Sequence, residues 1–219
     1  MPTYLAFGDS NTHGTKPVPE EEELSPSFAR WPYGTRWSSI AHNALADDWM
    51  LAEEGLPGRT TRFSDPIMGA HMDGQTGLKI ALMTHAPVAL ISIMLGTNDV
   101  KARLGAQPDD IAAGICSLID ILRDPELVAR AGEPQLLLIA PPPVQVTGIR
   151  AAEWLGSAEK SRALAPLFEQ IAGAYNVEFL DAGQIISVAP GEGIHFTEDS
   201  HRALGQAVGA KLAQMAGRC

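Results

Sequence analysis

Apolar residues along the chain form two patterns, which predict two kinds of element. Short continuous apolar runs predict buried strands, and they occupy residues 3–7, 50–52, 88–95, 135–140 and 177–180. The run VALISIML at 88–95 is the clearest of these, because it is apolar almost throughout and rich in β-branched side chains. Apolar residues at helical spacing predict helices over residues 36–45, 78–84, 109–129, 158–174 and 199–216.

This alternation of strands and helices predicts the fold class. Apolar strands separated by helices are typical of a parallel sheet that is covered on both faces. Five strands and about five helices predict a single three-layer α/β/α domain over residues 1–219. In such a sheet the functional site lies beyond the carboxyl ends of the strands. We therefore expect the site in the loops that follow residues 7, 52, 95, 140 and 180.

These loops contain the groups that acyl transfer requires. Ser10 follows the first strand, Asn98 follows the third, and His195 follows the last. A serine hydroxyl becomes a good nucleophile when a base takes its proton, and an imidazole can do so near neutral pH. A carboxylate on the other ring nitrogen would hold the histidine in the required tautomer. The sequence therefore predicts Ser10 as the nucleophile and His195 as the general base.

The tetrahedral intermediate of acyl transfer also needs hydrogen-bond donors for its oxyanion. The backbone N–H groups of Ser10 and Gly58 and the side-chain amide of Asn98 are the candidate donors. A glycine at position 58 is consistent with this role, because a side chain would obstruct the approach of a substrate to the backbone.

Four sequence blocks in this order resemble the SGNH (GDSL) hydrolases: FGDSNTHG (7–14), EEGLPGRTT (53–61), LGTND (95–99) and GIHFTEDSHRALG (193–205). The strings IMLGTNDVKA, APPP and FLDAGQIIS resemble the bacterial arylesterase and acyltransferase branch. The resemblance implies a flavodoxin-like sheet order, 2-1-3-4-5, and the same roles for Ser10, Gly58, Asn98 and His195. It also implies a small ester substrate, no metal, no organic cofactor, and a homo-oligomer.

The chain departs from the family pattern at the catalytic acid. The family acid is an aspartate three residues before the histidine, and here that position is Glu192. We assign Glu192 as the acid, although its carboxylate lies one methylene further from the backbone. Asp181 and Asp199 are the alternatives. A Ser–His dyad with a solvated Glu192 is also open.

Four further features carry expectations. His13 stands where the arylesterase branch often has an aromatic residue, and we expect it to bind substrate as a wall of the pocket. Trp154, in the insert at 144–156, is expected to line the pocket or to contact a second subunit. The acidic run at 20–23 is expected to be solvated, and His201 to face solvent on the last helix.

Composition excludes several classes of partner. The 219 residues carry a net charge of −10, which argues against binding to nucleic acid or to an anionic membrane. No apolar run approaches the length of a membrane span, and MPTYLAFGDS lacks the features of a signal peptide. Two cysteines, Cys116 and Cys219, are too few for a disulfide framework or a metal site. These features predict a cytoplasmic protein.

Three functions are consistent with the sequence. The first is a serine esterase that cleaves short-chain aryl or alkyl esters through an acyl-enzyme and can transfer the acyl group to alcohols. The second is a carbohydrate O-acetylesterase that uses the same groups. The third, from a different class, is a non-catalytic flavodoxin-like binding module.

Overall fold

The computed structural model describes residues 1–18 and 29–217, so the acidic run at 20–23 and Cys219 lie outside the described residues. All pairings between the strands of its five-stranded sheet are parallel. The strands are β1 (Thr3–Gly8), β2 (Met50–Gly55), β3 (Val88–Met94), β4 (Gln135–Ala140) and β5 (Glu178–Asp181). Their order, β2-β1-β3-β4-β5, confirms the expected 2-1-3-4-5 arrangement.

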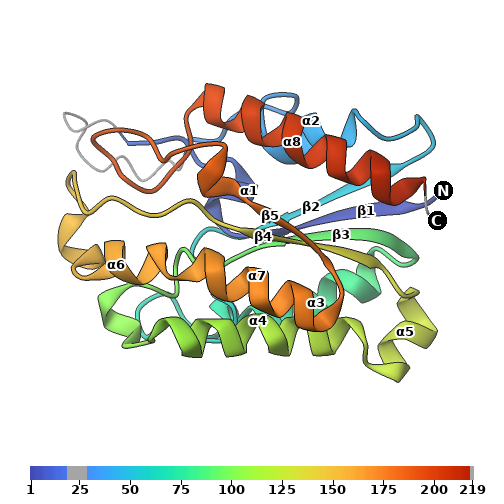
Figure 1. Cartoon of the computed structure of the whole chain (residues 1–219), viewed down its shortest axis with the longest axis horizontal. Helices are drawn as coiled ribbons and strands as arrows, with labels where there is room; N and C mark the ends of the chain where they lie inside the picture. The colour runs from blue at the N-terminus through green and yellow to red at the C-terminus, as the bar shows by residue number, and fades with distance from the viewer. Residues whose placement is uncertain (19–28, 218–219) are drawn as a thin grey trace.

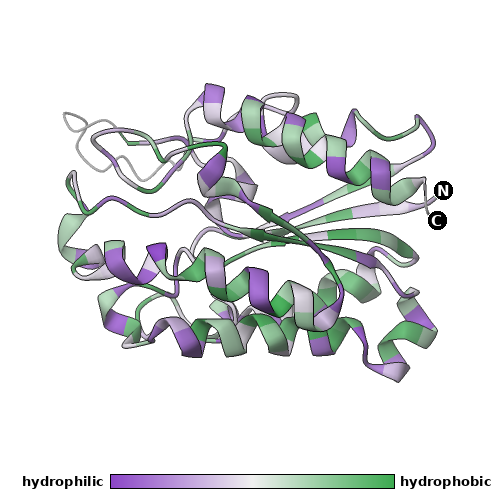
Figure 2. Ribbon diagram, viewed as in Figure 1, coloured by the Kyte–Doolittle hydropathy of each residue, from purple (hydrophilic) through white to green (hydrophobic). Residues whose placement is uncertain are grey.

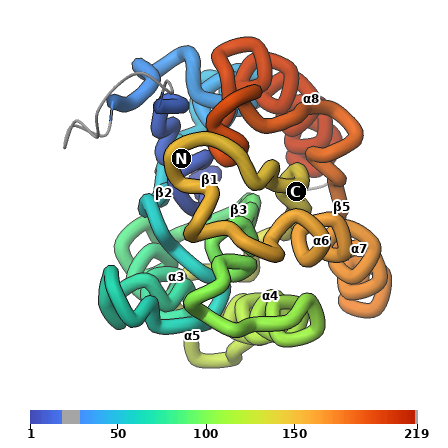
Figure 3. The backbone as a smooth tube through the Cα atoms, turned by 90° about the vertical axis from the view of Figure 1, so that its left-hand side faces the viewer, coloured from blue at the N-terminus to red at the C-terminus, as the bar shows by residue number. Residues whose placement is uncertain are grey.

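Helices cover both faces of the sheet, which confirms the three layers (Figures 1 and 3). One face carries α2 (Trp37–His42) and α8 (Glu198–Ala216). The other carries α3 (Gly74–Thr84), α4 (Pro108–Leu122), α5 (Pro125–Ala131), α6 (Ser157–Arg162) and α7 (Leu164–Tyr175). The short α1 (Ser10–His13) follows β1, and single 3₁₀ turns occupy Ala70–Met72, Ala102–Leu104, Ala151–Trp154 and Ala182–Gln184. Within the described residues, no helix is long and apolar enough to cross a bilayer.

Side chains of β1 point alternately to the two faces of the sheet, so this strand contributes to the hydrophobic core on both faces. Leu5 and Phe7 pack in the hydrophobic cluster beneath α3, α4 and α7, whereas Tyr4 and Ala6 pack in the cluster beneath α2 and α8. Complete burial of a large apolar side chain contributes roughly 1.5–3 kcal/mol. In Figure 2 the strands are mainly hydrophobic, and many polar residues lie on the outer sides of the helices. The apolar runs in the sequence are therefore strands that are buried on both faces.

Two predicted helices are each divided in the structure. The segment 109–129 breaks between α4 and α5. The Asp124 side chain caps α5 by accepting hydrogen bonds from the backbone N–H groups of Glu126 and Leu127, and Pro125 is the first residue of this helix. The segment 158–174 breaks at Ala163. Pro166 has no N–H to donate to the carbonyl of Arg162, so the helical hydrogen-bond pattern cannot continue through this point.

The boundaries of two other elements also differ from the prediction. Strand β2 continues to Gly55, because Glu53, Glu54 and Gly55 pair with Ala6, Phe7 and Gly8 of β1. Helix α3 begins at Gly74 instead of residue 78, and the Asp73 side chain caps it through the Gln75 N–H at 2.9 Å. Cys116 on α4 is half-buried and has a free thiol.

The solvent-facing position expected for His201 is wrong. The side chain is fully buried between α2 and α8, and its Nδ1 accepts a hydrogen bond from the Trp37 backbone N–H at 3.2 Å. The Phe196 ring packs edge-on against it, with the ring centroids 5.5 Å apart. Burial, with smaller contributions from Arg36 and His195, lowers the pKa of His201 to about 4.

This burial predicts a pH-dependent stability. A histidine that resists protonation when folded takes up a proton on unfolding, so its contribution to stability falls as the pH decreases from about 6.5 towards about 4. Between pH 7 and pH 5 the loss attributable to His201 is about 2 kcal/mol. His201→Asn keeps an acceptor for the Trp37 amide but has no imidazole to protonate. We therefore expect its free energy of unfolding, measured in urea, to decrease by about 2 kcal/mol less than that of the wild type between pH 7 and pH 5. An equal decrease in the free energy of unfolding of the wild type and the variant would contradict this account.

Candidate active site

The loop after β1 places Ser10 at the carboxyl end of the sheet. Asp9 caps α1 by accepting a hydrogen bond from the Asn11 backbone N–H at 2.9 Å, so Ser10 is the first residue of that helix. The Asn11 side chain in turn donates to the Ile194 carbonyl at 3.1 Å. Two segments at opposite ends of the chain are therefore held together beside Ser10.

Ser10, His195 and Glu192 form a continuous chain of hydrogen bonds. The Ser10 Oγ lies 3.1 Å from His195 Nε2, and His195 Nδ1 lies 2.6 Å from Glu192 Oε1. All three residues are buried, with 5–7% of each exposed. Buried groups are weakly screened by water, so their hydrogen bonds and charges interact strongly. This arrangement can move a proton from a serine hydroxyl to an imidazole that a carboxylate orients.

The loop that contains Glu192 accommodates the longer side chain. Glu192 Oε2 accepts hydrogen bonds from the backbone N–H groups of Ile194 at 2.9 Å and His195 at 2.7 Å, which leaves Oε1 for the imidazole. Gly193 has φ +85°, and a Cβ there would lie 2.2 Å from the Gln145 carbonyl oxygen. Burial opposes ionisation, but the hydrogen bonds and charge of His195 hold the pKa of Glu192 below its usual value. The carboxyl group is therefore ionised at neutral pH.

The two alternative acids have other partners. Asp181 accepts a hydrogen bond from the Gly183 N–H at 2.8 Å and caps the following 3₁₀ turn. Asp199 is exposed and pairs with Arg202 at 2.7 Å. Among the described residues, Glu192 is the only carboxylate that is hydrogen-bonded to the His195 ring.

The three candidate oxyanion donors line the same cavity as His195. Gly58 has φ +94°, a backbone conformation that favours glycine, and a Cβ there would lie 2.5 Å from the Cε of Met68, which would have to move. The Asn98 side-chain nitrogen donates to the Arg59 carbonyl at 3.1 Å and lies 3.4 Å from Asp9 Oδ2. These contacts hold the amide at the edge of the cavity.

The loops are braced by buried polar contacts that carry no separate chemistry. The Arg59 guanidinium donates to the carbonyls of Gly8 and Glu54 and lies 4.1 Å from the centroid of the Phe7 ring. It joins the ends of β1 and β2 and supports the loop that contains Gly58. Burial lowers the pKa of Arg59 to about 10, so it remains charged at neutral pH.

Two buried aspartates complete this support. Asp99 accepts hydrogen bonds from the backbone N–H and the hydroxyl of Thr61, at 2.8 and 2.5 Å. Burial raises the pKa of both Asp9 and Asp99 to about 6. These carboxyl groups hold loop backbone in place and keep Asn98 beside Ser10.

A cavity of about 470 Å³ opens at Ser10 and His195. Pro57, Ile67, Met68, Trp154 and Ile194 form much of its apolar wall. Trp154 thus lines this cavity, and it is 3% exposed. His13, expected as another wall, is not among the lining residues of this cavity in the part of the chain that the structure describes. Burial and the charges of Arg30 and Arg36 lower its pKa instead.

Sequence reasoning missed several walls of the cavity. Ile67 and Met68 come from the turn around residues 65–69, where Asp65 accepts hydrogen bonds from both backbone N–H groups. Lys101 and Arg103 follow the GTND block closely, and Arg150 belongs to the 144–156 insert. The short distance of Lys101 from Asn98 in the sequence was the available signal for its place in the site.

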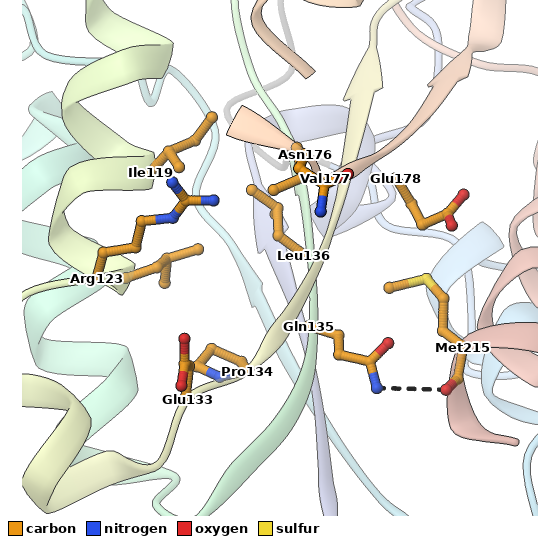
Figure 4. Close-up of a pocket in the computed structure, with 11 residues that line it drawn as sticks. Ile119, Arg123, Glu133, Pro134, Gln135, Leu136, Asn176, Val177, Glu178 and Met215 are labelled. Atoms are coloured by element: carbon orange, nitrogen blue, oxygen red, sulfur yellow. Dashed lines mark hydrogen bonds between the residues drawn. The ribbon is translucent and has the colours of Figure 1, made fainter. Parts of the chain in front are cut away.

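A second cavity, of about 370 Å³, lies at the opposite ends of β4 and β5 (Figure 4). Gln135 and Glu178, the first residues of these two strands, are among its lining residues, and Gln135 donates to the Met215 carbonyl at 3.4 Å. No serine, cysteine or histidine of the described residues lines this cavity. The groups for acyl transfer are gathered only at the first cavity within the described chain.

A profile of the GDSL-like lipase/acylhydrolase family matches residues 6–203 of the chain. No match was found among curated proteins. The matched range contains Ser10, Gly58, Asn98, Glu192 and His195.

Several solved structures are similar over nearly the whole chain. Est24, a carbohydrate acetylesterase from Sinorhizobium meliloti, is 35% identical, with a TM-score of 0.90 and coverage of 98% of this chain and 100% of the other. The aryl esterase of M. smegmatis is 34% identical, with the same TM-score and coverage. A carbohydrate acetylesterase family member from Sinorhizobium meliloti is 31% identical, with a TM-score of 0.88 and coverage of 99% and 100%.

Proposed function

The chain belongs to the GDSL-like lipase/acylhydrolase family and is a carboxylic ester hydrolase, and we propose that it cleaves short-chain aryl and alkyl esters through an acyl-enzyme on Ser10. The observation that carries this proposal is the hydrogen-bonded chain of Ser10, His195 and Glu192 at the cavity. The non-catalytic binding module is set aside, because the family and the similar structures are those of ester hydrolases.

In the proposed mechanism, Ser10 Oγ attacks the ester carbonyl carbon while His195 Nε2 takes the hydroxyl proton. The ionised Glu192 stabilises the imidazolium that forms. As the tetrahedral intermediate collapses, the C–O bond to the alcohol breaks and His195 returns the proton to the leaving oxygen. A water molecule, deprotonated by His195, then releases the acid and restores the Ser10 hydroxyl.

Donors at the cavity edge support the stabilisation of the oxyanion. Among the described residues, neither the Ser10 nor the Gly58 backbone N–H has a hydrogen-bond acceptor. We propose that both point their hydrogens at the substrate oxygen, together with the Asn98 amide. Because the charge on this oxygen is greatest in the transition state, these donors act mainly on kcat.

Asn98→Ala tests this assignment. We expect a loss of kcat of roughly 10²- to 10³-fold with a small change in KM, because one preorganised donor is removed. Steady-state kinetics with 4-nitrophenyl acetate measures both constants. Thermal unfolding of the same sample checks that the variant is folded, because the substitution also removes the contacts of Asn98 with Asp9 and Arg59. A decrease in kcat of less than about fivefold, in a folded variant, would contradict the assignment.

The walls of the cavity support the choice of substrate. Five apolar residues and a volume of about 470 Å³ suit a small organic ester. The same walls could hold an alcohol in place of water, so we also propose transfer of the acyl group to alcohols. With 4-nitrophenyl acetate and added ethanol, the formation of ethyl acetate measures transfer and the formation of acetate measures hydrolysis. Hydrolysis alone, at all ethanol concentrations, would exclude transfer.

A carbohydrate O-acetylesterase is the second candidate, and it is favoured by the likeness to Est24. The two activities are separated by comparing kcat/KM for 4-nitrophenyl acetate with that for acetylated xylo-oligosaccharides. Our proposal expects the aryl acetate to be the better substrate. A higher kcat/KM for the oligosaccharides would reverse the order of the two candidates.

A further inference from the structure

Lys101 is a buried cation that lines the Ser10 cavity. The residue is only 6% exposed. Within residues 1–18 and 29–217, its Nζ has no hydrogen bond or ion pair, and it lies 5.1 Å from the centroid of the Trp154 ring. A buried cation is costly unless it is paired, so a ligand that supplies the missing charge would be stabilised here.

The carboxylates of Glu153, Asp65 and Asp9 act on the charge of Lys101, but within the described residues none of them forms an ion pair with it. Arg103 makes ion pairs with Asp65 at 2.8 Å and with Glu153 at 2.9 Å. These contacts are direct and charge-assisted, and they occupy both acids. The Lys101 ammonium is therefore available to form an ion pair with a ligand that enters the cavity.

Cationic side chains outnumber carboxylates on the cavity wall. Among the described lining residues, Lys101, Arg103 and Arg150 are cationic and Glu153 is the one carboxylate; because Arg103 is paired with Glu153 and Asp65, the cations without an ion pair are Lys101 and Arg150. The whole chain, by contrast, carries a net charge of −10. In the described part of the chain, the buried Trp154 Nε1 also lacks an acceptor. An excess of cationic side chains at a cavity of an acidic protein, with two donors unsatisfied, indicates a ligand that brings negative charge.

We propose that the preferred substrates are esters that carry an anionic group, such as a carboxylate, which binds the Lys101 ammonium while the ester carbonyl lies at Ser10. This inference rests on the proposed function, because it deepens the substrate class of the same site. The anionic group can belong to the acyl part or to the alcohol part of the ester. Arg150, which is half-buried at the same cavity, would add a weaker attraction.

Two pairs of esters distinguish these sources. 4-Acetoxybenzoate and 4-acetoxybenzamide differ by a charge on the alcohol part. Mono-4-nitrophenyl adipate and 4-nitrophenyl hexanoate differ by a charge on the acyl part. In at least one pair, we expect Lys101→Met to reduce the ratio of kcat/KM for the anionic over the neutral ester by roughly tenfold or more, mainly through KM. Lys79→Met, which removes an exposed lysine on α3, should leave both ratios unchanged.

A measurement on the unchanged protein gives an independent readout. Burial lowers the pKa of Lys101 to about 8; the Arg103 charge acts in the same direction, and Glu153, Asp65 and Asp9 oppose it. Lys101 loses its charge above that pH, so the preference for the anionic ester should decrease between about pH 7 and pH 9. A change in the rate of the chemical step affects both esters of a pair and cancels in the ratio. In Lys101→Met the ratio should not change over this range.

Binding of amide analogues separates this inference from the proposed function. By calorimetry, wild-type protein should bind 4-acetamidobenzoate roughly tenfold more tightly than 4-acetamidobenzamide, and Lys101→Met should bind them equally. This result would support the anion site even if no ester were turned over. Equal binding by the wild type, with both substrate ratios unchanged in Lys101→Met, would overturn the inference and leave the esterase proposal standing.

Discussion

We expect Ser10→Ala to lower kcat for 4-nitrophenyl acetate by roughly 10⁴-fold or more, because no acyl-enzyme can form without the hydroxyl. The side chain lies 3.1 Å from His195 Nε2, and the substitution removes one oxygen atom from a cavity wall. The fold should therefore be unchanged. A fluorophosphonate probe, which reacts with activated serines, should label the wild type once and should not label the variant.

Ser117→Ala is the matched control for this prediction. Ser117 lies on α4, where its hydroxyl bonds to the Ala113 carbonyl at 2.9 Å, and it is not among the lining residues of the Ser10 cavity. The control should retain wild-type turnover and labelling. If Ser10→Ala kept more than about a tenth of the wild-type kcat, Ser10 would not be the nucleophile.

Glu192→Gln is expected to lower kcat by roughly 10³- to 10⁴-fold. The two carboxylate oxygens have different tasks, since Oε1 faces His195 Nδ1 and Oε2 accepts the Ile194 and His195 backbone N–H groups. If the glutamine places its NH₂ against Nδ1, His195 is held in the tautomer that cannot accept the Ser10 proton. If it places its NH₂ against the backbone, two donors face each other and the loop is disturbed.

Asp181→Asn and Asp199→Asn are the controls for the choice of acid. Asp181 caps a 3₁₀ turn, and Asp199 pairs with Arg202 at the surface. Each should retain kcat within about threefold of the wild type, because an exposed ion pair or a turn cap affects mainly stability. The measurement is kcat for 4-nitrophenyl acetate in all three variants. A larger loss in Asp181→Asn than in Glu192→Gln would assign the acid to Asp181.

Local pattern accounts for most of the fold. The strands could be predicted because each is buried on both faces and is therefore apolar throughout. The divided helices were missed although their signals are local: Asp124 and Pro125 form a helix start inside an apolar-periodic segment, and Pro166 interrupts another. Periodicity alone does not detect such breaks, because the second helix can continue the same apolar face.

Burial of polar residues could not be predicted in this way. His201 is on the final helix, and its sequence neighbours do not reveal that α2 packs against it. Lys101 is likewise buried by Trp154, which is distant in the sequence. The environment of a polar side chain depends on segments that fold against it, and a single sequence does not record those contacts.

The sequence by itself determined the layered α/β class, the loops that bear Ser10, Asn98 and His195, and the family. These follow from short-range patterns and from motifs that keep their order along the chain. Only the tertiary structure decided which carboxylate faces the imidazole and that cationic side chains outnumber carboxylates on the cavity wall. The reason is physical: Glu192, Asp181 and Asp199 are chemically alike, so the sequence does not distinguish them. A hydrogen bond between groups as distant in the sequence as Ser10 and His195 forms only if the loops place the two atoms to within a few tenths of an ångström.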